Sequence, residues 1–253
     1  MPLPIAIQLY TIRDTLAKDF AAGVRKIAEM GYVGVETAGF PGTTAKEASK
    51  LFGELGLTVT SAHAPLPLGE QKNEVLDAIG ELGCKRLVCP WVSPDHYQTL
   101  DLLKGTCERF NEANAVAVAH GLEFGLHNHW WEFEQVEGQY AHDILLAELD
   151  PAIFFQIDTY WVKVAGLDPA QIVTQFADRA PLLHIKDGPA TKKDPMTAVG
   201  AGILEWAEIM SAAEGHAEWL IVELDRCATD MMSAVEESYT YLTGAGFARG
   251  NRP

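Results

Sequence analysis

Four carboxylate or imidazole side chains of this 253-residue chain each lie near the end of a separate apolar run: Glu132, Asp158, His184 and Glu223. Successive members are separated by about the length of one strand-plus-helix unit. In a barrel of parallel strands all strand ends open onto one face, so residues far apart in sequence converge there. Three oxygen donors and one imidazole nitrogen suit a divalent cation such as Mn²⁺, Mg²⁺, Co²⁺ or Zn²⁺. The pattern predicts one catalytic divalent metal ion.

The position of these residues matters as much as their type. Asp158 ends an otherwise apolar strand, Phe154–Asp158, where a buried carboxylate without a partner would be costly. Metal coordination or a strong hydrogen-bond partner would remove that cost, and the same argument applies to His184 and Glu223. For any one of them alone, a salt-bridged residue at the barrel rim is the alternative. Glu132 lies several residues beyond its strand, close to other glutamates.

The segment His127–Glu132 concentrates histidines and tryptophans just after the fifth predicted strand. His127 and His129 could themselves form a metal pair, because alternate residues of a strand share a face. We favour instead a substrate ligand at His127 and an acid/base catalyst at His129. A structural network of histidine and asparagine hydrogen bonds is the alternative.

Further side chains are expected at the same mouth of the barrel. His63 ends the third strand, Trp91 follows the fourth, and Trp161 follows the sixth. A tryptophan can stack on the apolar face of a sugar ring, and a histidine can bind hydroxyl groups. We therefore assign these three residues to substrate binding, while expecting some of the chain's tryptophans to be core residues.

Lys186 lies two residues after His184, so the two side chains share an orientation on the strand. The ammonium group could stabilise a developing enolate or bind a carboxylate or phosphate. An ion pair with a nearby carboxylate is an equally good interpretation. Together with Glu132, Glu223 and His129, Lys186 completes the set of predicted catalytic residues.

Periodic apolar patterns predict eight strand-then-helix units. The predicted strands are Ile5–Leu9, Val33–Glu36, Thr58–His63, Arg86–Pro90, Glu123–His127, Phe154–Asp158, Leu182–Lys186 and Trp219–Glu223. The predicted helices are Ala21–Met30, Ala45–Leu55, Val75–Leu82, Tyr97–His120, Tyr140–Leu149, Pro169–Phe176, Leu204–Glu214 and Met231–Leu242. Regular alternation of strand and helix implies a parallel sheet, and eight units match a closed barrel. The predicted fold class is α/β, with residues 1–253 forming a single (β/α)8 TIM barrel.

Composition and net charge limit the classes of molecule to which the protein is expected to bind. The net charge of −16 and pI of about 4.8 disfavour binding to nucleic acid or to an anionic membrane. No basic segment followed by a long apolar stretch opens the chain, and its four cysteines form no CxxC pair. We expect a cytoplasmic protein with reduced thiols. Its oligomeric state is left open, a homo-oligomer included.

Several motifs of other enzyme classes do not occur in the sequence. It contains no GxGxxG or GxxxxGK[ST] motif for nucleotide binding and no GxSxG elbow of a hydrolase. The paired carboxylates of a glycosidase remain an alternative, although an Asp, a His and two Glu are a mixture more typical of a metal site.

Several strings resemble the xylose isomerase-like TIM-barrel superfamily, in its sugar phosphate isomerase/epimerase group: Gly125–Phe133, Asp158–Trp161, Leu183–Asp187, Val199–Gly202 and Val222–Asp225. The first contains His-Asn-His-x-x-Glu-Phe, the signature of one branch. The resemblance covers Ile5 to Leu242. It implies a divalent metal held by Glu132, Asp158, His184 and Glu223. Many members place the first glutamate within the fifth strand, where this chain has Gly125, so that role passes to Glu132.

The activity that follows is a metal-dependent isomerisation or epimerisation of a sugar, sugar phosphate or keto-polyol in carbohydrate metabolism. The metal would chelate a carbonyl and its adjacent hydroxyl and acidify the intervening C–H. A dehydratase or lyase using the same proton abstraction is the closest alternative. A sugar-binding barrel without catalysis and a DNA-repair endonuclease are further alternatives, and the acidic charge argues against the last.

Overall fold

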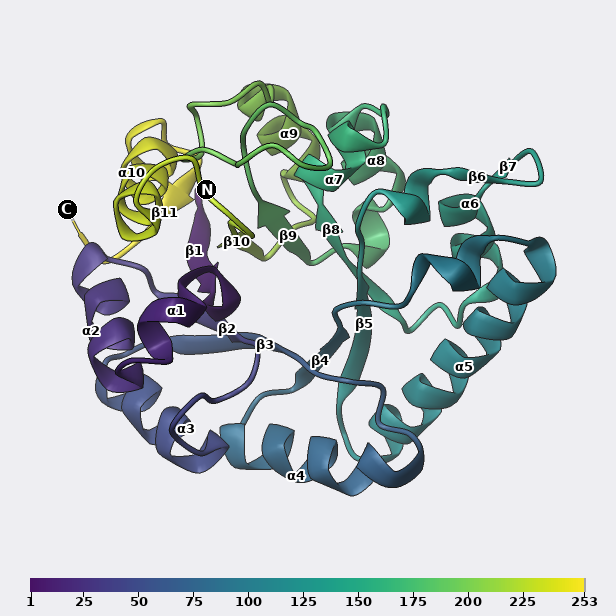
Figure 1. Ribbon diagram of the computed structural model, residues 1–253, viewed down its shortest axis with the longest axis horizontal. Helices are drawn as coiled ribbons and strands as arrows, with labels where there is room; N and C mark the ends of the chain where they lie inside the picture. The colour runs from purple at the N-terminus through teal and green to yellow at the C-terminus, as the bar shows by residue number, and fades with distance from the viewer. Residues whose placement is uncertain (253) are drawn as a thin grey trace.

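Eight parallel strands close into a barrel at the centre of the molecule (Figure 1). The computed structural model describes residues 1–252. The first and last barrel strands pair with each other, and the register places Ile5 opposite Leu220. In order around the barrel the strands are β1 (Leu3–Gln8), β2 (Gly34–Thr37), β3 (Thr58–His63), β4 (Arg86–Cys89), β5 (Glu123–His127), β8 (Phe154–Asp158), β9 (Leu182–Ile185) and β10 (Trp219–Val222). The predicted (β/α)8 barrel is confirmed.

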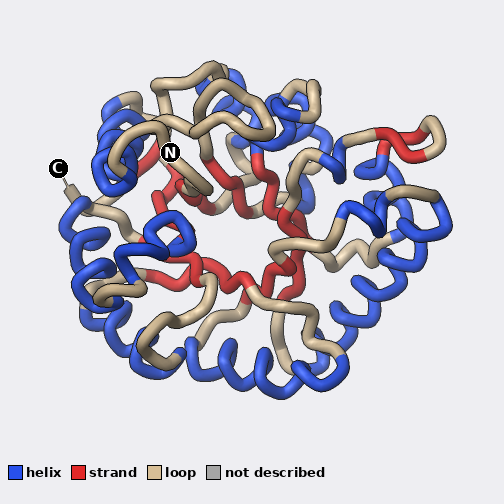
Figure 2. Tube along the Cα trace, in the orientation of Figure 1, coloured by secondary structure: helices blue, strands red, loops and turns tan. Residues whose placement is uncertain are grey.

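Helices form a ring outside the strands (Figure 2). They are α1 (Arg13–Leu16), α2 (Phe20–Met30), α3 (Ala45–Glu54), α4 (Lys72–Leu82), α5 (Leu100–Ala119), α6 (Ala141–Glu148), α7 (Thr159–Val164), α8 (Pro169–Gln175), α9 (Trp206–Ala213) and α10 (Met231–Gly244). Short 3₁₀ helices cover Leu9–Ile12, Gly69–Gln71, Pro94–Tyr97, Trp131–Phe133 and Ala177–Arg179. A hairpin of β6 (Gln135–Val136) and β7 (Gln139–Tyr140) follows the fifth barrel strand, and β11 (Ala248–Arg249) pairs with β1.

Local sequence signals explain where the helices begin and end. Asp19 caps α2 by accepting a hydrogen bond from the backbone N–H of Ala22. The same helix ends at Gly31, whose φ of 100° lies in the left-handed region that favours glycine. At α3, Thr44 and Glu47 form a reciprocal capping box. These ends match the helix boundaries that the sequence predicts.

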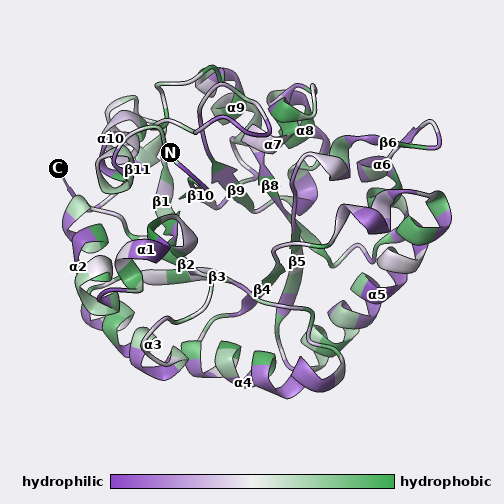
Figure 3. Cartoon of the chain, viewed as in Figure 1, coloured by the Kyte–Doolittle hydropathy of each residue, from purple (hydrophilic) through white to green (hydrophobic). Residues whose placement is uncertain are grey.

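The barrel wall separates two apolar cores. Residues of one strand face fill the space between the sheet and the surrounding helices, where most of the buried apolar side chains lie. A smaller cluster fills the barrel interior: Ala6, Val88, Phe154, Leu182 and Ile221, with Trp219 packed against them. Figure 3 shows hydrophobic residues along the strands and hydrophilic residues toward the outer rim. The interior cluster plugs one end of the barrel and leaves the other end for polar side chains.

Several elements were not predicted from the sequence. They are α1, α7, the β6–β7 hairpin, β11 and the 3₁₀ helices. The long helix begins at Leu100 rather than at Tyr97, because Pro94–Tyr97 form a separate 3₁₀ helix and Thr99 caps α5 through the backbone N–H of Leu102. Within residues 1–252 no helix combines the length and apolar character needed to cross a membrane.

Gly125 of β5 is a position where the interior packing excludes a side chain. A Cβ at Gly125 would collide with the ring of Phe154, which fills the interior from the neighbouring strand β8. Replacing Gly125 with alanine is expected to destabilise the fold by about 1–3 kcal/mol, through overpacking. Thermal unfolding would measure this as a melting temperature lower by roughly 2–4 °C for each kcal/mol.

Gly53→Ala is the matched control, because Gly53 lies in helix α3 and a Cβ there meets no atom within 4 Å. It is expected to leave stability unchanged or to raise it slightly, since alanine is the better helix former. Equal melting temperatures for Gly125→Ala and wild type would contradict the packing described here.

Candidate active site

Four ionisable side chains gather at the carboxyl ends of the barrel strands. His127 ends β5, Asp158 ends β8, His184 lies in β9, and Glu223 directly follows β10. One potential ligand atom from each lies within 4.8 Å of the corresponding atoms of the other three, and all four residues are buried. We call this set the His/Asp/Glu cluster. A cluster of this composition could bind a metal ion.

Three of the four predicted ligands belong to this cluster, and Glu132 does not. Glu132 lies in the 3₁₀ helix Trp131–Phe133, where its Oε2 accepts a hydrogen bond of 2.9 Å from the backbone N–H of His129. It lines an apolar cavity together with Phe110 of α5 and Leu145 of α6. The chain turns into the 3₁₀ helix directly after β5, and this carries Glu132 to the helix side of the barrel wall.

His127 provides the fifth-strand member of the cluster, although the sequence assigned it to substrate binding. The earlier strand position, Gly125, cannot carry a carboxylate because the Phe154 ring occupies that space. His127 lies two residues further along β5 and therefore faces the same side. The fifth strand thus contributes an imidazole where the sequence-based interpretation places a carboxylate.

Lys186 lies inside the cluster and is almost completely buried. Its Nζ is 2.7 Å from Glu223 Oε2, 3.0 Å from Asp158 Oδ2 and 2.9 Å from Asp225 Oδ2. Burial alone would lower the pKa of Lys186, but these three carboxylates outweigh it and raise that pKa well above its ordinary value. Of the two interpretations offered by the sequence, the ion pair is present.

A buried carboxylate beneath the cluster organises the interior of the barrel. Glu36 of β2 accepts hydrogen bonds from Gln8 Nε2 at 2.6 Å, Ser61 Oγ at 2.5 Å and Gln156 Nε2 at 2.5 Å. A fourth partner is His184, whose Nε2 is 2.7 Å from Glu36 Oε1. Burial would raise the pKa of Glu36, but the nearby histidines and these hydrogen bonds lower it to about 2. Glu36 is therefore ionised.

The glutamine partners of Glu36 were not assigned to the site from the sequence. Their signal is the presence of polar residues within apolar strands, as in Gln156 of Phe-Phe-Gln-Ile-Asp and Gln8 at the end of β1. Both are fully buried. A buried glutamine is tolerated only where its amide is hydrogen-bonded, and both amides donate to Glu36.

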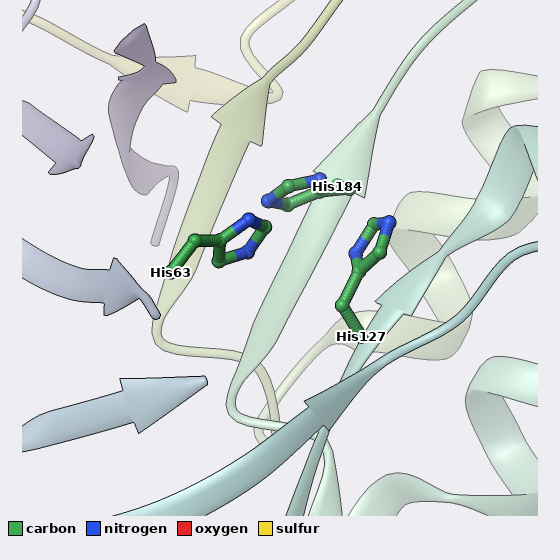
Figure 4. A group of neighbouring side chains, drawn as sticks. All are labelled: His63, His127 and His184. Atoms are coloured by element: carbon green, nitrogen blue, oxygen red, sulfur yellow. The ribbon is translucent and has the colours of Figure 1, made fainter. Parts of the chain in front are cut away.

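His184 is held at both ring nitrogens. Its Nδ1 is 2.8 Å from Glu223 Oε2, and its Nε2 faces Glu36. Burial would lower the pKa of His184, but Glu36 and Glu223 raise it to about 10. Figure 4 shows its ring converging with those of His63 from β3 and His127 from β5. The ring centroids of His127 and His184 are 4.7 Å apart, and those of His63 and His184 are 5.5 Å apart.

The donor set fits a divalent cation. Asp158 Oδ2 and His127 Nδ1 are buried and have no hydrogen-bond partner within residues 1–252, since the Lys186 ammonium near Asp158 is not aligned for a hydrogen bond. Burial raises the pKa of Asp158 to about 6 in spite of Lys186 and His184. The cationic groups at this site are Lys186 and His184. They face four carboxylates, those of Glu36, Asp158, Glu223 and Asp225. Negative charge is therefore in excess, and a further positive charge would be stabilised.

Comparison with known proteins identifies the family of the chain. A family model described as a xylose isomerase-like TIM barrel matches residues 24–243. The chain belongs to the xylose isomerase-like TIM-barrel family. The family resemblance inferred from the sequence is thereby confirmed.

Solved structures give the same family. A sugar phosphate isomerase/epimerase from Parabacteroides distasonis ATCC 8503 is 25% identical, with a TM-score of 0.82 over 98% of this chain and 96% of that one. A second protein of that name from the same organism is 26% identical, with a TM-score of 0.83 over 98% and 100%. An L-ribulose 3-epimerase shares the fold at 16% identity, with a TM-score of 0.73 over 98% and 95%. No curated protein matches the sequence.

Aromatic side chains line one side of the mouth of this xylose isomerase-like barrel. His129 stacks on Trp131 with ring centroids 4.3 Å apart, and Trp130 packs against Trp161 at 5.1 Å. Burial lowers the pKa of His129 to about 3, so its ring is neutral. Trp161 is buried, whereas Trp91 is 55% exposed. Of the two tryptophans assigned to substrate, Trp91 therefore has the more accessible ring.

The loop that follows β9 is fixed at its base by Asp187. The carboxylate of Asp187 accepts hydrogen bonds from the backbone N–H groups of Gly200 and Leu204 and from Trp206 Nε1. Further out, Lys192 Nζ pairs with Glu134 Oε1 at 2.8 Å and lies 5.0 Å from the centroid of the Trp130 ring. This loop therefore joins the segment that follows β5 and forms a wall of the mouth.

The pKa of Glu132 predicts how the stability of the fold depends on pH. Burial raises this pKa from 4.5 to about 8, because the hydrogen bonds that the carboxylate accepts offset only part of this effect. Because the folded state favours the protonated form, Glu132 costs stability increasingly as the pH rises from 4.5 through 8. Glu132→Gln is therefore expected to raise the melting temperature of metal-free protein by roughly 5 °C at pH 9 and to have little effect at pH 4.

Thermal unfolding at pH 4, 6 and 9 measures this difference. Glu29→Gln, an exposed change on α2, is the control and is expected to show no such trend. A gain of the same size at pH 4 and pH 9 would show that ionisation of Glu132 does not determine the effect.

Proposed function

We propose that this protein is a divalent-metal-dependent isomerase or epimerase of a sugar, sugar phosphate or keto-polyol. The observation that carries the proposal is the buried His/Asp/Glu cluster at the carboxyl ends of the strands, the face on which TIM-barrel enzymes carry out their chemistry. The names of the two Parabacteroides relatives support the same class.

Four residues would hold the ion: His127, Asp158, His184 and Glu223. When bound, such an ion acts as a Lewis acid that polarises a substrate carbonyl and acidifies the neighbouring C–H. Glu36 keeps the His184 ring in place from below, with its Nε2 toward Glu36 and its Nδ1 toward the cluster. This orientation leaves Nδ1 as the ligand atom.

Glu223 is the better proton acceptor of the two glutamates expected to act as a base. Although Glu223 is buried, Lys186 and His184 hold its pKa well below the ordinary value, so it is ionised. Glu132, with a pKa of about 8, is largely protonated at neutral pH and lies outside the cluster. When Lys186 donates to a substrate oxygen rather than to Glu223, the carboxylate becomes a stronger base.

Other residues would bind the substrate and its developing charge. The Lys186 ammonium donates to the oxygen that gains negative charge during proton abstraction. His129, neutral and with a buried Nδ1 that has no hydrogen-bond partner among residues 1–252, would donate to or accept from a substrate hydroxyl. His63 would bind a second hydroxyl, Trp91 would stack on the sugar ring, and Trp161 would form the wall behind it.

We retain a cytoplasmic location, and we retain the view that neither nucleic acid nor membrane is a partner. The net charge of −16 supports the latter, because phosphate-rich surfaces would repel the protein. A homo-oligomer remains compatible with the proposal, since the cluster draws all four residues from one chain.

Metal content provides the first test. Protein purified without a metal-affinity tag is expected to contain about one divalent ion per chain. Asp158→Ala and His184→Ala should lower this to near zero while circular dichroism shows an intact fold. Glu29→Ala, on the surface of α2, should retain the ion. Full metal occupancy in both cluster variants would contradict the ligand set.

Proton exchange provides the second test. A panel of keto-sugars, with and without phosphate, is incubated with enzyme in D₂O, and deuterium in substrate and product is measured by mass spectrometry. Glu223→Gln is expected to reduce incorporation at least about 100-fold, as loss of a general base does. Loss of water from the substrate would identify a dehydratase or lyase, and binding without exchange would identify a sugar-binding barrel.

A further inference from the structure

The donor atoms of the His/Asp/Glu cluster differ from those of the set expected from the sequence. The expected set contains three carboxylates and one imidazole, whereas the observed cluster contains two of each. We infer that the site selects borderline transition-metal ions such as Zn²⁺ and Co²⁺ over Mg²⁺, because its fifth-strand ligand is His127. This inference rests on the metal dependence proposed above and concerns which ions the site accepts.

His127 is placed as a ligand. Its side chain is buried, and its Nδ1 has no hydrogen-bond partner within the part of the chain that the structure describes. Its Nε2 lies 4.0 Å from Asp158 Oδ2, beyond hydrogen-bond reach but suited to a shared ion between the two groups. Asp158 Oδ2 is itself buried without a hydrogen-bond partner among residues 1–252, and a cation held between it and His127 Nε2 would remove that cost.

Neither position 125 nor Glu132 supplies a carboxylate in place of His127. At Gly125 the ring of Phe154 fills the space that a side chain would need. Glu132 is held on the other side of the wall by its hydrogen bond to the backbone of His129. The nitrogen donor is therefore built into the packing of β5 and β8.

A third imidazole, that of His63, adds to the preference of the site for ions that bind nitrogen. His63 of β3 forms a second group with His127 and His184, in which one ring nitrogen of each lies within 4.8 Å of the others. The ring centroids of His63 and His127 are 5.4 Å apart (Figure 4). His63 Nε2 is directed to Gln156 Oε1 at 2.7 Å. Even as a neighbour of the ion, His63 makes this side of the site rich in nitrogen.

The ligand chemistry then discriminates between ions. Mg²⁺ prefers oxygen ligands in octahedral geometry and gives up its waters reluctantly, whereas imidazole suits Zn²⁺, Co²⁺ and related ions. Exchanging one carboxylate for an imidazole also removes one negative charge from the ligand set. Both effects weaken binding of Mg²⁺ relative to Zn²⁺.

The test compares dissociation constants of metal-free wild type and His127→Glu for Zn²⁺, Co²⁺ and Mg²⁺ by titration, without substrate. Nearly every site with nitrogen and oxygen donors binds Zn²⁺ more tightly than Mg²⁺, so the informative quantity is the change in their ratio. We expect His127→Glu to reduce the preference for Zn²⁺ over Mg²⁺ at least about tenfold. Glu29→Gln, an exposed change on α2, should leave the ratio unchanged.

His127→Gln provides a second measurement if the buried glutamate impairs folding. With Co²⁺ bound, loss of an imidazole ligand should shift the visible d–d absorption of the ion and weaken Zn²⁺ binding at least about tenfold. An unchanged ratio in His127→Glu and an unchanged Co²⁺ spectrum in His127→Gln would overturn the inference and leave metal dependence intact. If wild type binds none of the three ions, both the inference and the proposed metal dependence fail.

Discussion

The structure depends on the mutual neutralisation of ionised groups enclosed by the barrel. Glu36 in β2, Asp158 in β8 and Glu223 just after β10 are carboxylates that are all removed from water. Each would be costly alone. The cationic groups Lys186 and His184 lie between them, so that no carboxylate lacks a positive neighbour. The barrel can bury this much charge because adjacent strands hold the opposite charges at hydrogen-bonding distance.

The apolar cluster in the barrel interior determines the direction in which the ionised side chains extend. Phe154 and Ile221 fill the interior at one end, and Trp219 covers them. The polar layer rests on this plug, so its side chains can extend only toward the mouth. The glutamines of β1 and β8 then link the layer sideways through Glu36. Packing and charge pairing thus reinforce each other, since a loosened plug would also misplace the carboxylates.

Much of the fold was predictable because its signals are local. Alternating apolar strands, amphipathic helices and closing residues such as Gly31 each lie within a short window of sequence. Three cluster members, Asp158, His184 and Glu223, were predictable for the same reason, since each ends or closely follows an apolar strand. The α1 and α7 helices are too short for their pattern to be distinguished from loop sequence.

The member of the cluster that comes from the fifth strand could not be predicted in this way. Whether Glu132 or His127 enters the cluster depends on the turn into the 3₁₀ helix after β5. It depends also on the ring of Phe154 from a different strand, which closes the space at Gly125. These are contacts between residues distant in sequence, and the periodic pattern within a strand does not predict them. The Glu36 network is not visible in the sequence for a similar reason, because the partners of Glu36 come from four other strands.

The pairing of β10 with β1 has a consequence for folding. Strand β10 begins at Trp219 and pairs with a strand that lies far from it in the sequence, and contacts of this kind form only after chain entropy has been lost. Before the two strands pair, Glu223 is absent from the His/Asp/Glu cluster, and Lys186 and His184 lack one of their main counter-charges. A partly folded chain can therefore hold most of the barrel wall while its charge network is incomplete. Closure of the ring and neutralisation of the buried charges are coupled in folding.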